Sequence, residues 1–108
     1  MSNVGKVIEI MQQRFNPQAA VGLDLVFQFR LEDDDNYYVR VRNNQCELTV
    51  GDAPLADVVF ITDYESLKQV IKGELSGMHA YMSGRLRIEG NLMQAMQLKS
   101  LFQADAED

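Results

Sequence analysis

Residues 37–50 constrain the fold more than any other segment, because they specify a β-hairpin with a single register. Asn43 and Asn44 both tolerate positive φ, as a two-residue hairpin turn requires. A turn on these residues pairs position 42 with position 45, and side-chain alternation then decides which residues share a face. The apolar face contains three cross-strand pairs: Tyr37 with Val50, Val39 with Leu48, and Val41 with Cys46. The other face contains two polar pairs: Arg40 with Glu47, and Tyr38 with Thr49. This pattern predicts an antiparallel meander that is covered on one side only.

Three further segments predict strands that extend this meander. Residues 23–31 alternate Leu or Phe with mostly polar residues, which indicates a long, half-buried strand. The acidic run at residues 33–36 is typical of a turn leading into the hairpin. Residues 57–61 and 85–89 predict a fourth and a fifth strand.

Helical signals precede the strands and lie between them. Residues 4–15 carry apolar side chains with helical spacing, and either Ser2 or Asn3 can cap this helix. Asn16 and Pro17 end it, and Asn16 can cap a short new turn.

A second helix is predicted after the fourth strand. Thr62 and Glu65 have the spacing of a capping box, which makes Thr62 the expected N-cap residue. The helical apolar stripe that follows stops at Gly73, a residue typical of helix C-termini.

Two more helices are predicted in the last third of the chain, over residues 77–82 and over residues 92–102, the latter capped by Gly90 and Asn91. The last helix has apolar residues in almost every direction, so it requires a second apolar neighbour. That neighbour can be another subunit, a deep core position or a bound apolar ligand. These two helices also carry four of the six methionines, whose flexible side chains suit either core gaps or irregular apolar ligands: Met78, Met82, Met93 and Met96.

Composition and charge limit the classes of function. The 108 residues form one domain over residues 1–108, of which we expect 103–108 to be a frayed tail. The net charge of -6 and the pI near 4.6 oppose binding to nucleic acid or to an anionic membrane through bulk charge. The apolar run at residues 58–61 is far too short to span a bilayer, so no stable membrane insertion is expected.

The inventory of reactive residues is small. One cysteine, Cys46, and one histidine, His79, cannot build an internal disulfide or a His/Cys metal cage, so no metal and no cofactor is expected. Cys46 is predicted on the inward face of a strand, where a thiol is normally inert, and His79 lies on a distant helix. We therefore predict no catalytic residues and no enzyme activity. The free thiol, together with the lack of an apolar signal region or an address signal at the two ends, favours the cytoplasm.

Two clusters of charged residues are candidate binding sites. The acidic run at residues 33–36 lacks the glycine and the terminal glutamate of an EF-hand loop, so a solvated turn explains it better than calcium binding. Arg30, Arg40 and Arg42 form a basic stripe on the solvent face, which could steer an acidic headgroup or partner. Cross-strand pairing with Glu32 and Glu47 explains this stripe better.

Three segments carry a resemblance to a known family: residues 56–63 (ADVVFITD), residues 67–73, and residues 82–96. The most specific part is a strand framed by two glycines, residues 84–91 (GRLRIEGN), followed by the apolar last helix. In these segments, and in the order of elements over nearly the whole chain, the sequence resembles the sterol carrier protein 2 family.

The resemblance implies an α+β fold in which a curved, five-stranded, mostly antiparallel sheet and helices on one face enclose an apolar tunnel. It implies non-enzymatic binding or transfer of a lipid or fatty acyl ligand, by a monomer or a weak homodimer. The side chains expected to contact that ligand are Phe15, Phe27, Phe29, Val39, Met78, Met82, Met93, Met96 and Phe102.

Two departures from the family pattern bear on the ligand. Ser76 and Gly77 stand where family members often have Asn-Pro or Asp-Pro, so the local tunnel wall is expected to differ. The terminal residues 106–108 do not match the peroxisomal targeting tripeptide, which favours a small bacterial member. The ligand is therefore left open among sterol, fatty acyl, isoprenoid and polyketide-like chains. The alternative function is an accessory protein, for example in lipid-quinone biosynthesis, whose apolar last helix contacts a subunit or partner.

Overall fold

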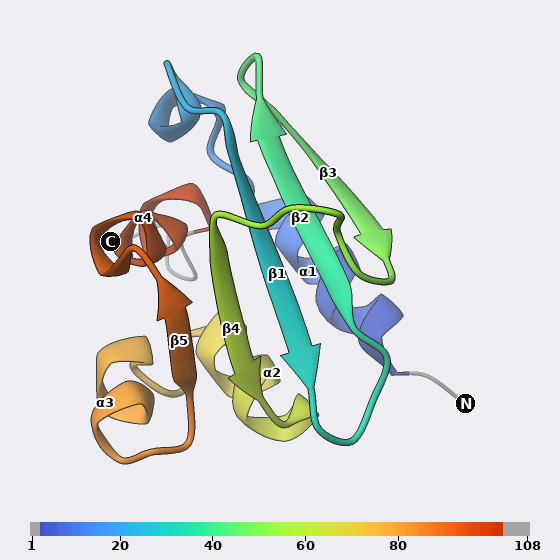
Figure 1. Cartoon of the computed structure of the whole chain (residues 1–108), viewed down its shortest axis with the longest axis vertical. Helices are drawn as coiled ribbons and strands as arrows, with labels where there is room; N and C mark the ends of the chain where they lie inside the picture. The colour runs from blue at the N-terminus through green and yellow to red at the C-terminus, as the bar shows by residue number, and fades with distance from the viewer. Residues whose placement is uncertain (1–2, 103–108) are drawn as a thin grey trace.

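The computed structural model describes residues 3–102 and contains one five-stranded mixed sheet with the strand order β3-β2-β1-β4-β5 (Figure 1). Neighbouring strands are antiparallel except for β1 and β4, which run parallel. The strands are β1 (Leu25–Leu31), β2 (Tyr37–Arg42), β3 (Gln45–Val50), β4 (Val58–Thr62) and β5 (Arg87–Gly90). The predicted α+β fold with a five-stranded, mostly antiparallel sheet is confirmed.

The hairpin register predicted from the two asparagines is also confirmed. Asn43 and Asn44 have φ values of 55° and 60°, and Arg42 pairs with Gln45 across the turn. The remaining β2–β3 pairs follow the predicted register, from Val41 beside Cys46 to Tyr37 beside Val50. Because β3 lies at the edge of the sheet, its inner-face side chains are only partly covered, and Val50 is exposed.

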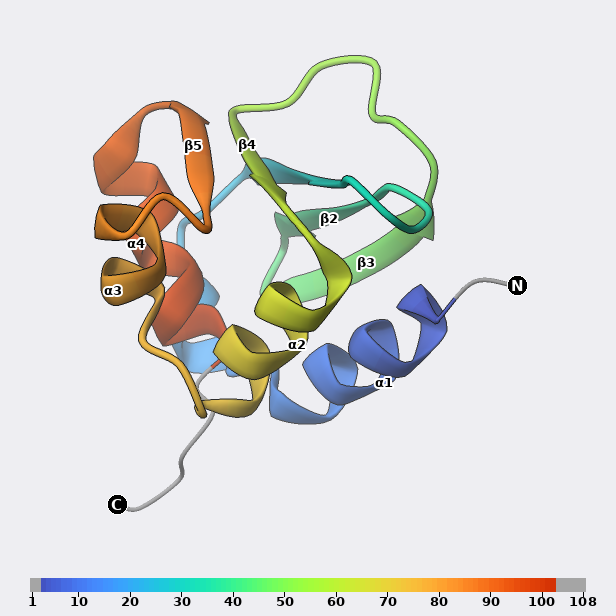
Figure 2. The same ribbon diagram turned by 90° about the horizontal axis from the view of Figure 1, so that it is seen from below.

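Helices and the β3–β4 connection lie on opposite faces of the sheet. Figure 2 shows α1 (Val4–Arg14) and α2 (Tyr64–Lys72) beneath one face, with α3 (Gly77–Met82) and α4 (Leu92–Leu101) beside β5. A short 3-10 helix, η1 (Pro17–Ala20), links α1 to β1. We call the face that packs on α1 and α2 the inner face and the opposite one the outer face.

The β3–β4 connection crosses the outer face and is attached there by Gln28, which is buried. The Nε2 atom of Gln28 donates to the carbonyls of Tyr37 and Gly51, at 3.1 and 3.2 Å. Its Oε1 atom accepts from the backbone N–H of Ala53 at 2.7 Å. This crossing lets β4 enter the sheet beside β1 and parallel to it.

Several helix ends follow the sequence predictions. The side chain of Asn16 accepts from the N–H of Gln18 at the start of η1, and Asn91 caps α4 in the same manner by accepting from Gln94. Gly73 ends α2 with a φ of 84°.

One predicted cap is wrong, and the predicted cap of α1 by Ser2 or Asn3 is not confirmed. Thr62 is not the N-cap residue of α2, because its hydroxyl donates to the carbonyl of Arg85 at 2.8 Å. Asp63 takes that place and accepts from the N–H of Ser66 at 3.2 Å. At α1, the side chain of Asn3 accepts no capping hydrogen bond, and Ser2 lies outside the described residues.

The predicted element boundaries shift by one or two residues. The first strand begins at Leu25 instead of residue 23, the fourth covers Val58–Thr62, and the fifth begins at Arg87 instead of residue 85. The predicted frayed tail, residues 103–108, lies outside the described residues.

The structure explains why position 90, one of the two glycines in the family-like segment 84–91, requires glycine. Gly90 has a φ of 105° and pairs with Val58 at the end of β5. A Cβ atom at this position would lie 2.5 Å from the carbonyl oxygen of Asp57. Only a residue without a side chain therefore allows β5 to approach the start of β4.

We expect the substitution Gly90→Ala to destabilise the protein more than Gly51→Ala does. Both glycines have positive φ, so each alanine introduces backbone strain of about 1–3 kcal/mol. At Gly51 a Cβ meets nothing within 4 Å, whereas at Gly90 it collides with backbone and adds about 1–3 kcal/mol of overpacking. Urea denaturation of both variants measures the difference, and equal losses of stability would contradict the close approach at Gly90.

Candidate functional site

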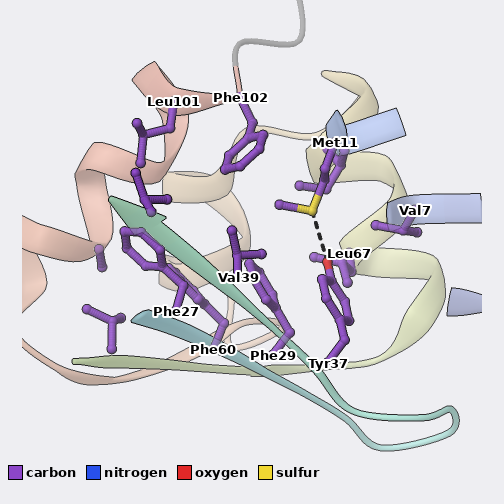
Figure 3. Packing of buried hydrophobic residues seen from close by; sticks show 14 of the residues in the cluster. Val7, Met11, Phe27, Phe29, Tyr37, Val39, Phe60, Leu67, Leu101 and Phe102 are labelled. Carbon is purple, nitrogen blue, oxygen red and sulfur yellow. Dashed lines mark hydrogen bonds between the residues drawn. The ribbon is translucent and has the colours of Figure 1, made fainter. Parts of the chain in front are cut away.

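Aromatic side chains cover the inner face of the sheet (Figure 3). The ring of Phe29 stacks on Tyr37 at 4.7 Å and on Phe60 at 5.1 Å between centroids. Phe27 joins this group through Phe60, and the centroids of their two rings lie 6.1 Å apart. These residues come from three adjacent strands and are buried, because alternation directs all of them to the same face.

Tyr37 connects this aromatic group to α1. Its hydroxyl donates to the Sδ atom of Met11 at 3.1 Å, and both residues are fully buried (Figure 3). Burial raises the pKa of Tyr37 well above its ordinary value, because the apolar surroundings disfavour the phenolate. The phenol therefore stays neutral and acts as a fixed donor inside the core.

The end of α4 closes one side of the same interior. The backbone N–H of Asn16 donates to the carbonyl of Leu101 at 2.8 Å, and the rings of Phe15 and Phe102 lie 5.5 Å apart. Leu101 and Phe102 are buried, and Phe15 is half-buried. These contacts hold the C-terminal end of α4 against the segment that follows α1.

The rest of α4, and all of α3, are packed in an unusual way. Before Leu98, the residues that these helices bury are small, Ala80 in α3 and Ala95 in α4, whereas most of their large apolar side chains there face solvent. We call the exposed set the α3/α4 apolar surface: Met78, Tyr81, Met82, Leu92, Met93 and Met96. These six residues are the majority of the exposed large apolar side chains in residues 3–102. Exposed apolar clusters in soluble domains commonly mark ligand or protein contacts.

The structure separates the nine residues predicted to contact a ligand into two groups. The interior holds Phe15, Phe27, Phe29, Val39 and Phe102. The four methionines do not lie in the interior to which the sequence assigned them. Met82 and Met93 expose 79% and 78% of their surface, and Met96 and Met78 expose 56% and 50%. The reason is that α3 and α4 direct alanine, not methionine, toward the core. That either group contacts a ligand stays a prediction.

Sequence reasoning missed three residues that complete the interior group: Met11, Tyr37 and Phe60. The predicted hairpin register already placed Tyr37 on the apolar face, and the apolar spacing of residues 4–15 already included Met11. Phe60 pairs with Phe29 across the parallel β1–β4 ladder, a neighbour that local sequence did not indicate.

The reactive residues are dispersed. Cys46 is half-buried on β3, and burial raises the pKa of its thiol, which lowers the fraction of reactive thiolate. His79 is exposed on α3. Residues 3–102 contain no group of three or more His, Cys, Asp or Glu side chains placed to hold a metal ion.

The acidic turn before β2 accepts hydrogen bonds from the starts of helices. Asp33 accepts from the backbone N–H of Tyr64 at 2.9 Å, and Asp34 accepts from that of Asn3 at 3.0 Å. Negative charge is favourable at these helix N-termini. Among the described residues, no helix is both long and apolar enough to cross a membrane.

Comparison with known proteins finds one family model and several relatives that match most of the chain. The SCP-2 sterol transfer family matches residues 8–103. Hydroxysteroid dehydrogenase-like protein 2 of Rattus norvegicus is 27% identical over 101 residues, which cover 91% of this chain and 19% of that protein. The chain spans 19–25% of the length of the curated relatives that it matches, so only one segment of each corresponds to it.

Two solved structures show the same fold over 94% or more of their length. Palmitated SCP2L2 from Aedes aegypti superposes with a TM-score of 0.72 at 20% identity, with 100% of both chains covered. The UbiJ-SCP2 ubiquinone synthesis protein superposes with a TM-score of 0.76 at 15% identity, with 94% of both chains covered.

The orientation of α4 can be tested by enlarging side chains on its two sides. We expect Met93→Trp and Met96→Trp to change the free energy of unfolding by no more than about 0.5 kcal/mol, because both sites are exposed. We expect Ala95→Met to cost about 1–3 kcal/mol, because Ala95 is buried and the added atoms overpack the core. Chemical denaturation measures all three. A larger loss from Met93→Trp than from Ala95→Met would show that the methionine side of α4 is the packed one.

Proposed function

The chain belongs to the SCP-2 sterol transfer family, and from this premise we propose that it binds a lipid or long-chain acyl ligand between the inner face of the sheet and α3/α4, without catalysing a reaction. The observation that carries the proposal is the inverted packing of α3 and α4, which keep large, flexible apolar side chains beside an apolar interior. The family relation and the palmitated neighbour of the same fold support an acyl chain as ligand.

The packing of α3 and α4 suits the entry of a chain. Ala80 and Ala95 bury little apolar area, so moving α3 and the N-terminal part of α4 away from the sheet forfeits less hydrophobic free energy than moving the end of α4, which Leu101 and Phe102 anchor. The inserted chain would then contact Phe27 and Phe60 on one side. Methionines of the α3/α4 apolar surface can turn toward the chain on the other side, because their side chains have three rotatable bonds.

The energy of chain burial agrees with a carrier that releases its ligand. Burying about ten methylenes at roughly 0.8 kcal/mol each gives about 8 kcal/mol, from which association subtracts at least about 4 kcal/mol. Binding through the chain alone is therefore weak and depends on chain length. Absence of catalysis is supported by the dispersed positions of Cys46 and His79.

A second candidate function is favoured by the same exposed surface. The α3/α4 apolar surface could contact a protein partner or a second copy of the chain, and the ubiquinone synthesis neighbour of the same fold suits an accessory role. Light scattering after size exclusion over a wide dilution series separates the two functions. A ligand site predicts a monomer at every concentration, whereas an interface predicts a dimer that dissociates on dilution.

We expect fatty acids to bind with an affinity that rises with chain length between about 10 and 16 carbons, because each buried methylene contributes roughly 0.8 kcal/mol. Displacement of a fluorescent fatty acid by the unlabelled series measures this slope. Met93→Trp and Met96→Trp should weaken binding without lowering stability. An affinity that is independent of chain length would contradict burial of the chain.

The matched control is the double variant Cys46→Ala, His79→Ala. It removes the two most reactive side chains of the described structure, neither of which has an assigned role in binding, so its affinity should equal that of the parent chain. Loss of binding at unchanged stability would give these residues a chemical role and overturn the non-enzymatic assignment.

A further inference from the structure

A hollow of about 100 Å³ opens on the outer face of the sheet, beside the turn of the β2–β3 hairpin. It lies across the sheet from the aromatic interior, because its strand residues occupy the outward positions of β2 and β3. At about 30 Å³ per water molecule, this volume has room for a small oxyanion. The residues that line it are Arg40, Arg42, Asn43, Gln45 and Glu47.

The two arginines of this hollow form no ion pair within the part of the chain that the structure describes. Arg40 lies opposite Glu47 in the register, as the sequence predicts, but no ion pair within 4.0 Å joins them or involves Arg42 in residues 3–102. Cross-strand ion pairing therefore does not account for the basic stripe. In a chain with a net charge of -6, two adjacent free guanidinium groups stand out.

Arg40 also has an orphaned donor. Its Nε atom is buried and has no hydrogen-bond partner in the protein. A buried donor without an acceptor is unfavourable, and native structures satisfy nearly all such groups. The guanidinium of Arg40, which lines the hollow, thus has donor capacity to spare.

We propose that this outer-face hollow binds a phosphate group, with Arg40 and Arg42 as its ligands. Residues two apart on a strand point to the same side, so both guanidinium groups can approach one anion. A tetrahedral phosphate offers oxygens in several directions and can accept from two separate guanidinium forks, whereas a carboxylate offers its two oxygens in one plane. The side-chain amides of Asn43 and Gln45 are further donors at the same hollow.

Glu47 opposes the anion and thereby makes the proposal more specific. Its carboxylate lines the same hollow, so it lowers the affinity for phosphate by like-charge repulsion. Neutralising Glu47 should therefore strengthen binding, whereas a purely structural role for the arginines gives no reason for that gain.

The test is a nuclear magnetic resonance titration of the full chain with inorganic phosphate, against chloride at equal ionic strength. We expect phosphate to shift the backbone amide signals of Asn43, Gln45 and Glu47, and chloride to leave them in place. The variants Arg42→Gln and Arg40→Gln should each weaken phosphate binding by about tenfold, the loss expected for one charge-assisted contact. Glu47→Gln should strengthen it by about twofold or more.

The matched control is Arg30→Gln, which removes the same charge from the same face at a position that does not line the hollow. Its effect should be less than about twofold, because an exposed charge at a distance is screened. Absence of phosphate-specific shifts, or an equal loss in Arg30→Gln and Arg42→Gln, would overturn the proposal. Arg42 is exposed, so its variant keeps the test valid even if Arg40→Gln fails to fold.

A parallel arm distinguishes a lipid headgroup from a free phosphate compound. Co-sedimentation with phosphatidylcholine vesicles, with and without phosphatidylglycerol, should depend on Arg42 and not on Arg30 if the phosphate belongs to a lipid. If soluble phosphate binds and vesicles do not, the ligand is a free phosphate compound. Binding of fatty acids should be the same in all four variants. A negative result for phosphate binding can therefore be distinguished from a negative result for the proposed acyl site.

Discussion

Side-chain alternation along β1, β2 and β4 is the constraint on which the rest of this structure depends. It directs Phe27, Phe29, Tyr37 and Phe60 to one face, where they stack and bury one another. A shift of β1 by one residue would replace the rings of Phe27 and Phe29 with Gln28 and Arg30, which the core cannot accept. The helices have a surface to pack on only because this alternation holds.

The same alternation gives the two faces of the sheet different chemistry. The inner face is apolar and joins α1 through the hydrogen bond from Tyr37 to Met11. The outer face carries Gln28, which holds the β3–β4 connection, and the free arginines of β2. An apolar ligand and an anionic ligand would thus occupy opposite faces of one sheet and would not compete.

The α3/α4 region follows a different rule from the rest of the fold. In α1 and α2 most large apolar residues are inside, whereas in α3 and the N-terminal part of α4 Ala80 and Ala95 are inside and methionines are outside. This arrangement leaves apolar area exposed and lowers the cost of separating α3 and the N-terminal part of α4 from the sheet. Both proposed functions, chain binding and partner contact, would cover that area, and they differ in whether the covering group is a lipid or a protein.

The sequence by itself determined what depends on local rules: the hairpin register set by Asn43 and Asn44, and the cap at Asn91. Only the tertiary structure decided which side of α4 is buried, because a helix that is apolar in all directions contains no periodic signal to orient it. Thr62 fits a capping box in sequence, yet its hydroxyl donates instead to the carbonyl of Arg85, which precedes β5. Likewise, the pairing of Arg40 with Glu47 followed from the register, but whether their charges meet depended on side-chain packing across the outer face, which local sequence does not specify.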